Sequence, residues 1–100
     1  MKGVVMSNLI EEILEACTDV EGKRNPHSTL AYLMEEVGEL ATEVNIRQGF
    51  SKKDPGEDGV IGEAADVILC AIDLIYQDNP FTTSYDIEEV IKSKLNKWKK

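Results

Sequence analysis

The segment from about Gly59 to Gln77 constrains the fold most, because its apolar residues extend nearly all round a predicted helix. Its predicted core stripe consists of Ile61, Ala64, Ala65, Ile68, Ile72 and Ile75. The apolar surface continues through Val67, Cys70, Ala71 and Leu74. The remaining narrow polar strip holds Glu63, Asp66, Asp73 and Gln77. A helix of this kind is buried on more than one side, so its acidic side chains need a partner other than water.

A second acidic group lies in the sequence LMEEVGELATEV, where Glu35, Glu36 and Glu39 fall inside another predicted helix. Residues three or four apart share a helix face, and like charges at that spacing destabilise a helix by a few tenths of a kcal/mol, roughly, per pair. A divalent cation would remove this repulsion. The alternative is an ordinary solvated acidic face, because glutamate is a good helix former.

Capping residues and apolar periodicity predict three further helices. They run from Ser7 or Asn8 to about Val20–Gly22, from Ser28 or Thr29 to about Gln48, and from Thr83 to Lys99. Gly49 is expected to stop the second of these, and Asp86 to complete the cap of the last. We therefore expect an all-α fold, in which residues 1–100 form a single four-helix bundle-like domain. A core this small favours assembly of the subunit into a dimer or tetramer.

The three other helices also have predicted core stripes. These are Leu9, Ile10, Ile13, Leu14 and Cys17 in the first, Leu30, Leu33, Met34, Val37, Leu40, Ala41 and Val44 in the second, and Ile87, Val90, Ile91, Leu95 and Trp98 in the last. Lys94 falls inside the last stripe and Lys97 at its edge. Either these lysines extend to solvent along the apolar surface, or they point at a phosphate or at the acidic groups.

Composition excludes several classes of function. The net charge of −8 disfavours binding to a nucleic-acid polymer, which relies on a basic patch. No segment has the length or pattern of a membrane span or a signal peptide. Cys17 and Cys70 lie in apolar helical patterns, and we expect them to be reduced core residues of a cytoplasmic protein. The aromatic residues are expected to pack in the core rather than stack on a base: Tyr32, Phe50, Tyr76, Phe81 and Trp98.

Two antiparallel helices would bring the two acidic groups together. Facing helices build metal sites in this way, and the converging side chains would be Glu36, Glu39, Glu63 and Asp66. Oxygen ligands without a nearby cysteine or histidine suit Mg²⁺ or Mn²⁺. The one histidine, His27, follows no ExxH pattern. Because Mg²⁺ bound by a few carboxylates shares its other positions with substrate phosphates, a nucleotide substrate is expected.

The pattern Glu35-Glu36-Val37-Gly38-Glu39, followed after a loop by Glu63-Ala64-Ala65-Asp66, resembles the MazG-like members of the all-α nucleoside triphosphate pyrophosphatase superfamily. The stretch HSTLAYLMEEVGELATEV is similar to the first motif helix of that family, and KLNKWKK to its basic C-terminal helix. The resemblance covers most of residues 27–100, whereas the first helix matches only in type.

This resemblance implies Mg²⁺-dependent hydrolysis of a nucleoside or deoxynucleoside triphosphate to the monophosphate and pyrophosphate. It also implies a homodimer or a dimer of dimers. The implied metal ligands are Glu36, Glu39, Glu63 and Asp66, with Glu35 as a further ligand or as the residue that orients the attacking water. The implied substrate contacts are Lys94 and Lys97 at the triphosphate, Asn96 as a further candidate, and His27 near the base or sugar. The sequence departs from the pattern in having no arginine after Asn96.

Two alternatives remain open from the sequence. The first is a helical dimerisation or regulatory module without catalytic activity, in which the same acids are a solvated face. The second is an enzyme acting on another phosphorylated metabolite, which would differ only in its substrate pocket.

Overall fold

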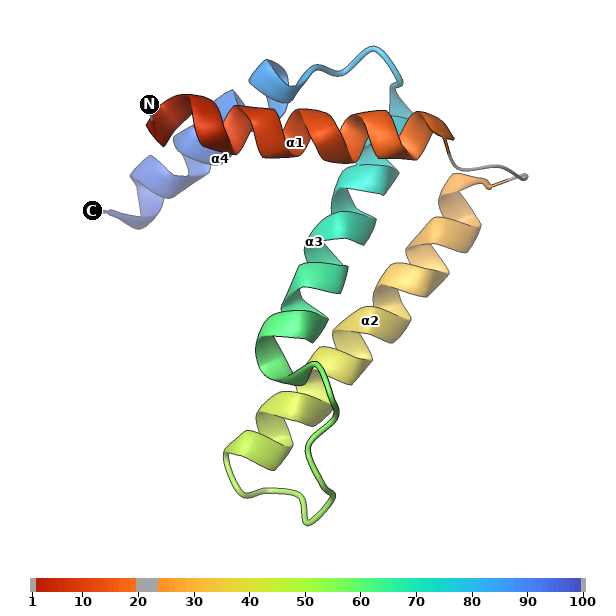
Figure 1. Ribbon diagram of the computed structural model, residues 1–100, viewed down its shortest axis with the longest axis vertical. Coiled ribbons are helices and arrows are strands. Elements are labelled where there is room, and N and C mark those ends of the chain that lie inside the picture. The colour runs from red at the N-terminus through yellow and green to blue at the C-terminus, as the bar shows by residue number, and fades with distance from the viewer. Residues whose placement is uncertain (1, 20–23, 100) are drawn as a thin grey trace.

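The computed structural model describes residues 2–19 and 24–99, with side chains from Leu9 onward. Its four helices are α1 (Lys2–Asp19), α2 (Pro26–Arg47), α3 (Gly59–Asp78) and α4 (Ser84–Trp98), and the described residues contain no strand (Figure 1). The predicted all-α class is therefore confirmed. No helix in this part of the chain has both the length and the hydropathy required to cross a membrane.

The predicted N-terminal cap of α4 is confirmed, whereas the predicted starts of α1 and α2 are wrong. Thr83 Oγ1 accepts a hydrogen bond from the Asp86 amide at 3.1 Å, and the Asp86 carboxylate accepts one from the Thr83 amide at 3.0 Å. The α2 cap is instead Asn25, whose Oδ1 accepts from the Ser28 amide at 2.9 Å. The predicted start at Ser28 or Thr29 is too late, because Pro26 is favourable at the first position of a helix.

The predicted start of the first helix is also wrong. α1 begins at Lys2, so Ser7 and Asn8 lie inside the helix rather than at its cap. No proline interrupts residues 2–8, and a helix can continue through a serine or an asparagine, whose helix propensity is only modestly unfavourable. The predicted end at Val20–Gly22 lies outside the described residues.

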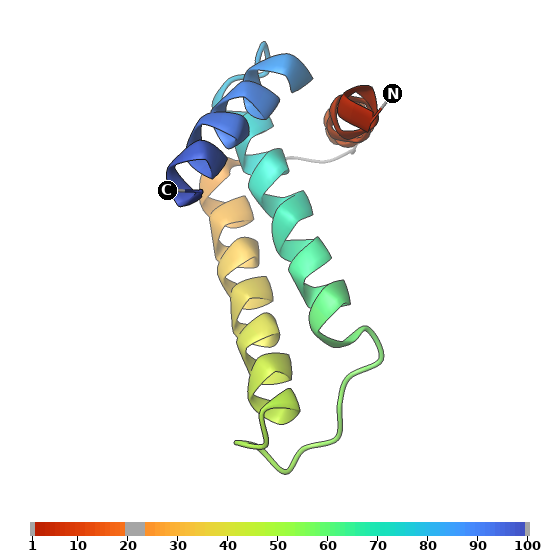
Figure 2. The ribbon, with the colours of Figure 1, turned by 90° about the vertical axis from the view of Figure 1, so that its left-hand side faces the viewer.

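Helices α2 and α3 form an antiparallel pair, and the segment between them returns the chain to the side of α2 (Figure 2). Gly49, with a φ of 82°, follows the end of α2 as predicted, because glycine adopts this left-handed conformation without steric cost. The Glu43 carboxylate accepts a hydrogen bond from the Gly56 amide at 3.0 Å. This contact fixes the connecting segment to α2 just before α3 begins.

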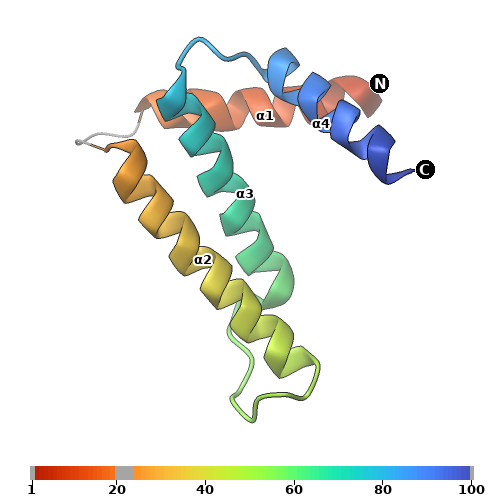
Figure 3. The same ribbon diagram turned by 180° about the vertical axis from the view of Figure 1, so that it is seen from behind.

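A small core joins α1 and α4 to the end of α3. It contains Ile10, Ile72 and Ile87, one from each of these helices, with Ile13 and Leu14 against it. α1 crosses α3 and packs against α4, so α4 does not run along the α2–α3 pair (Figures 1 and 3). The radius of gyration is 15.5 Å, whereas about 13 Å is typical of a compact domain of this length. One chain therefore does not form the compact four-helix bundle that we expected.

The predicted core stripes of α2, α3 and α4 are mostly exposed in the single chain, whereas the predicted α1 stripe is buried or half-buried apart from Leu9. The residues of α2 that are buried or half-buried are Thr29, Leu33, Glu36, Leu40, Glu43 and Ile46. Most residues of the predicted α2 stripe follow these by one position along the chain and are exposed, with Met34 at 60%. In α3 and α4, Ile61 and Trp98 are more than 80% exposed, at 83% and 84%. Only Ile72 and Ile87 of those two stripes are buried.

Most of the aromatic residues are also exposed, whereas the two cysteines are not. Tyr32, Phe50, Phe81 and Trp98 are exposed, so the prediction that they fill the core is wrong for one chain, whereas Tyr76 is half-buried. Of the two cysteines, both of which are free, Cys17 is buried as predicted and Cys70 is half-buried. The buried face of α2 is therefore mixed, with Leu33 and Leu40 beside Glu36 and Glu43.

Candidate functional site

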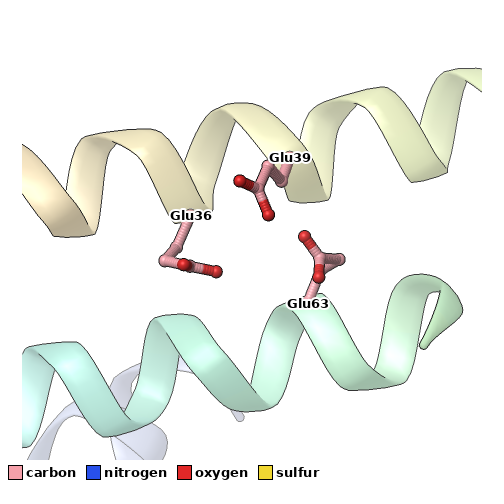
Figure 4. A group of neighbouring side chains, drawn as sticks. All are labelled: Glu36, Glu39 and Glu63. Atoms are coloured by element: carbon pink, nitrogen blue, oxygen red, sulfur yellow. The ribbon is translucent and has the colours of Figure 1, made fainter. Parts of the chain in front are cut away.

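The pairing of α2 with α3 brings the two acidic motifs together. Glu36 and Glu39 stand one turn apart on α2 and point toward Glu63 of α3 (Figure 4). Each of the three side chains offers a carboxylate oxygen, and these oxygens lie within 4.8 Å of one another. The antiparallel arrangement expected from the sequence thus produces the expected meeting of carboxylates.

A second group shares Glu63 with the first. It consists of Asp58, Glu63 and Asp66, whose carboxylate oxygens are also within 4.8 Å of one another. The three other acids predicted as metal ligands therefore gather around Glu63. We call these four residues, together with Asp58, the acidic site.

Asp58 is the member of the acidic site that the two sequence motifs do not include, because it lies in the polar segment just before α3. It lies at the N-cap position of α3, but its side chain makes no capping hydrogen bond. A Cβ at Gly62 would lie 2.2 Å from the Asp58 Cβ, so a glycine is needed one turn into the helix to leave room for this side chain. An acid just before the ExxD helix, followed four residues later by glycine, was the available signal.

The carboxylates perturb one another. The pKa of Glu63 is raised to about 7, first by a hydrogen bond with Glu39, then by burial and by the charge of Glu39. The pKa of Glu36 is raised by burial and by the charges of Glu39 and Asp66. Close carboxylates resist being ionised together, so without a cation the site retains a proton near neutral pH.

The residues present fit a divalent cation. None of the ion pairs in the described part of the chain includes Glu36, Glu39 or Glu63. Glu36 is only 7% exposed, and its Oε2 is buried without a hydrogen-bond partner among the described residues. A buried carboxylate oxygen needs a donor or a cation. The donor set is entirely oxygen, which suits Mg²⁺ or Mn²⁺.

The other predicted site residues are not brought to this place within one chain. Glu35 is exposed and belongs to neither carboxylate group, and His27 is exposed in the first turn of α2. Lys94, Asn96 and Lys97 are exposed on α4, which packs against α1 rather than against α2 or α3. Their proposed contacts with a substrate therefore require a second chain or a different position of α4.

A cleft of about 440 Å³ extends from the acidic site along the groove between α2 and α3. It shares Glu36 and Asp66 with the acidic site and continues toward Arg24, Tyr32 and Asp73. Tyr32 is 58% exposed there, and its pKa is raised mainly by the charge of Glu36. The volume lies in the range of about 300–1,000 Å³ that is usual for small-molecule sites.

These features define an all-α protein with a carboxylate-rich site and an adjoining cleft between two antiparallel helices. The family model described as the MazG nucleotide pyrophosphohydrolase domain matches residues 24–100, and the chain belongs to this family. The match includes α2, α3 and α4, and α1 lies before it. Searches of curated proteins and of solved structures found no match.

Proposed function

We propose that the protein is a Mg²⁺-dependent pyrophosphohydrolase that converts a nucleoside or deoxynucleoside triphosphate into the monophosphate and pyrophosphate. The observation that carries this proposal is the meeting of Glu36, Glu39 and Glu63 within 4.8 Å in a chain of the MazG family. With this substrate and two free cysteines, we place the protein in the cytoplasm, where nucleotides are made and thiols stay reduced.

In this proposal Glu36, Glu39, Glu63 and Asp66 hold the cation, and Asp58 is a further candidate ligand. Bound Mg²⁺, or Mn²⁺ in its place, would shield the phosphate charge, lower the pKa of a bound water and align the reacting groups. The water oxygen forms a bond to the α-phosphorus, the bond from that phosphorus to the oxygen bridging the α- and β-phosphates breaks, and the proton that the water loses passes to solvent. Pyrophosphate leaves, and Glu35 orients the water from the rim of the site.

Self-association forms part of the proposal, because one chain leaves a second helical seam of α2 uncovered. We call Leu30, Met34, Val37, Ala41 and Val44 the exposed seam, and all five residues are exposed. Their alternating spacing of four and three residues is the pattern with which helices pack against one another. A second copy that covers this seam would complete a four-helix bundle from two subunits, as a dimer or a dimer of dimers.

The same assembly would supply the contacts that one chain does not make. The site carries several negative charges, and a triphosphate needs cationic contacts besides the metal. We assign these contacts to Lys94 and Lys97, with Asn96 as a further candidate, from the α4 of a neighbouring subunit. His27 is proposed to lie near the base or sugar, because it precedes the cleft residue Ser28.

Product analysis tests the proposed reaction. The protein is incubated with Mg²⁺ and a panel of nucleoside triphosphates, deoxynucleoside triphosphates and sugar phosphates, and the products are separated by ion exchange. We expect monophosphate and pyrophosphate in equal amounts from at least one nucleotide. Release of inorganic phosphate with a diphosphate, or hydrolysis of sugar phosphates alone, would contradict the proposal.

A helical dimerisation module without catalytic activity is the second candidate, and the exposed seam is the observation that favours it. Thermal unfolding separates the two functions. A metal-binding enzyme is stabilised by Mg²⁺, and Glu39→Ala or Asp66→Ala abolishes that stabilisation. A dimerisation module whose acids are only a solvated face shows no Mg²⁺ effect in either the wild type or the variants.

A further inference from the structure

The end of the cleft away from the acidic site is formed by an ion pair. Asp73 lies two helical turns after Asp66 on α3, roughly 10 Å further along the helix axis. Its Oδ2 accepts a hydrogen bond from Nη1 of Arg24. Nη2 of the same guanidinium donates to the carbonyl oxygen of Cys17 at 2.8 Å. Arg24 is therefore held from two directions, and it fixes the Asp73 carboxylate at this end of the cleft.

The Asp73 carboxylate is only partly enclosed. Its Oδ1 is buried, and a hydrogen bond with Asp73 is one of the causes that raise the pKa of the Cys17 thiol. The side chain nevertheless lines the cleft and is 19% exposed. An ionised carboxylate can only accept hydrogen bonds, so the part of it that faces the cleft can accept an N–H group of a bound ligand.

Arg24 adds the complementary group. A guanidinium has five N–H donors, and two of its nitrogens bond Asp73 and Cys17. Arg24 also lines the cleft, so its remaining donors can reach a ligand acceptor beside the group that Asp73 accepts from. The distal end of the cleft thus offers an acceptor next to a donor.

We propose that Asp73, held by Arg24, is the base-selecting residue of the cleft and favours a base with an exocyclic amino group next to an unprotonated ring nitrogen. Cytosine and adenine carry this pair, whereas uracil and hypoxanthine carry a carbonyl oxygen next to a protonated ring nitrogen. In uracil and hypoxanthine the carbonyl oxygen would face the Asp73 carboxylate, which pairs two acceptors. The ring N–H of these bases would face Arg24, which pairs two donors. The inference rests on the proposed function, since it assigns the sugar and base to the cleft and the phosphates to the acidic site.

The test uses two pairs of substrates that differ only in these groups, dCTP with dUTP and dATP with dITP. In Mg²⁺ we expect the amino member of the better pair to have a kcat/KM at least about tenfold higher, since a site that hydrogen-bonds a substrate N–H rejects the analogue without it. Asp73→Asn has nearly the same shape but adds a donor, so it should reduce this ratio about tenfold. Asp78→Asn, an exposed residue of the same helix, is the matched control and should leave the ratio unchanged.

Binding of the monophosphates dCMP, dUMP, dAMP and dIMP, measured by calorimetry, separates this inference from the proposed reaction. Hydrolysis without a preference in either pair overturns the base assignment and leaves the reaction standing. Preferential binding of dCMP or dAMP that is lost in Asp73→Asn, in a protein that hydrolyses nothing, supports the base assignment and overturns the reaction. If neither hydrolysis nor binding shows a preference for the amino-bearing base, the inference is wrong. The wild-type protein alone provides these data, so this conclusion does not depend on whether the variant folds.

Discussion

The Glu63 carboxyl lies between the two groups of acids, and its protonation is linked to folding. Its pKa is raised from 4.5 to about 7 by the hydrogen bond with Glu39, by burial and by neighbouring negative charge. Between these two pH values the folded protein holds a proton at Glu63 that the unfolded chain has released. The free energy of unfolding therefore falls as the pH rises from about 4.5 through about 7 in the absence of a cation.

We predict that in EDTA the melting temperature falls between pH 5 and pH 8, and that Glu63→Gln removes much of this dependence because the amide carries no charge. Circular dichroism at a series of pH values measures both proteins. Glu57→Gln, an exposed residue of the preceding loop, is the control and should follow the wild type. Parallel curves for the wild type and Glu63→Gln would show that the acidic site does not carry this linkage.

The sequence predicted the residues of the acidic site better than it predicted their surroundings. Spacing of three places Glu36 with Glu39, and Glu63 with Asp66, on one face of any α-helix, so their convergence followed once the two helices paired. Asp58 and Asp73 did not follow from spacing. Asp58 lies against Gly62, where a Cβ would come within 2.2 Å of the Asp58 Cβ, and the role proposed for Asp73 depends on an arginine 49 residues away in the chain.

At the scale of the element, the start of α3 depends on a glycine. A Cβ at Gly62 would lie 2.2 Å from the Asp58 Cβ and 3.0 Å from its Cγ, and the Gly62 amide donates a hydrogen bond to the Asp58 carbonyl oxygen at 3.1 Å. Gly38 of α2 has nothing within 4 Å of the corresponding position. The two glycines are both helical, so their replacement separates a packing effect from a propensity effect.

We predict that Gly62→Ala displaces Asp58, lowers the melting temperature and weakens the stabilisation by Mg²⁺. Gly38→Ala should instead leave the Mg²⁺ effect unchanged and increase stability by up to about 1 kcal/mol, the usual difference between glycine and alanine in a helix. Thermal unfolding at several Mg²⁺ concentrations compares them. Equal behaviour of the two variants would mean that the close approach of Asp58 to Gly62 has no part in the site.

The helix ends that were predicted correctly depend on residues close to them in the sequence. The Thr83–Asp86 capping box begins α4, and Gly49 follows the end of α2. The start of α1 at Lys2 was missed because a helix can continue through a serine or an asparagine. The Asn25 cap of α2 was missed because Pro26 is favourable at the first position of a helix, although proline disrupts the interior of one.

At the scale of the whole molecule, the exposed seam of α2 explains why the predicted core was wrong for one chain. Two seams run side by side along α2. One contains Leu33 and Leu40, which are half-buried, and the other is the exposed seam, which contains Met34 and Ala41 at the same spacing. They are offset by a single residue, about 100° round the helix. Periodicity alone does not decide which seam faces α3 and which is left exposed in one chain.

We predict that the protein in solution has at least twice the mass of one 11.1 kDa chain. Met34→Glu should reduce this mass, because it places a charge in the middle of an apolar interface, whereas Asn45→Glu at an exposed polar position should not. Light scattering coupled to size-exclusion chromatography measures the mass. A monomeric wild type, or a Met34→Glu variant of unchanged mass, would contradict the assembly.

The proposed reaction requires that the acids between α2 and α3 hold the cation on which nucleotide hydrolysis depends. The rate of pyrophosphate release as Mg²⁺ is titrated tests this, for the wild type and for Glu39→Gln, with EDTA as the zero point. We expect no release in EDTA, a saturable rise with Mg²⁺ in the wild type, and in the variant a loss of activity or a shift to much higher Mg²⁺. Release that persists in EDTA, or an identical Mg²⁺ dependence in the variant, would contradict it.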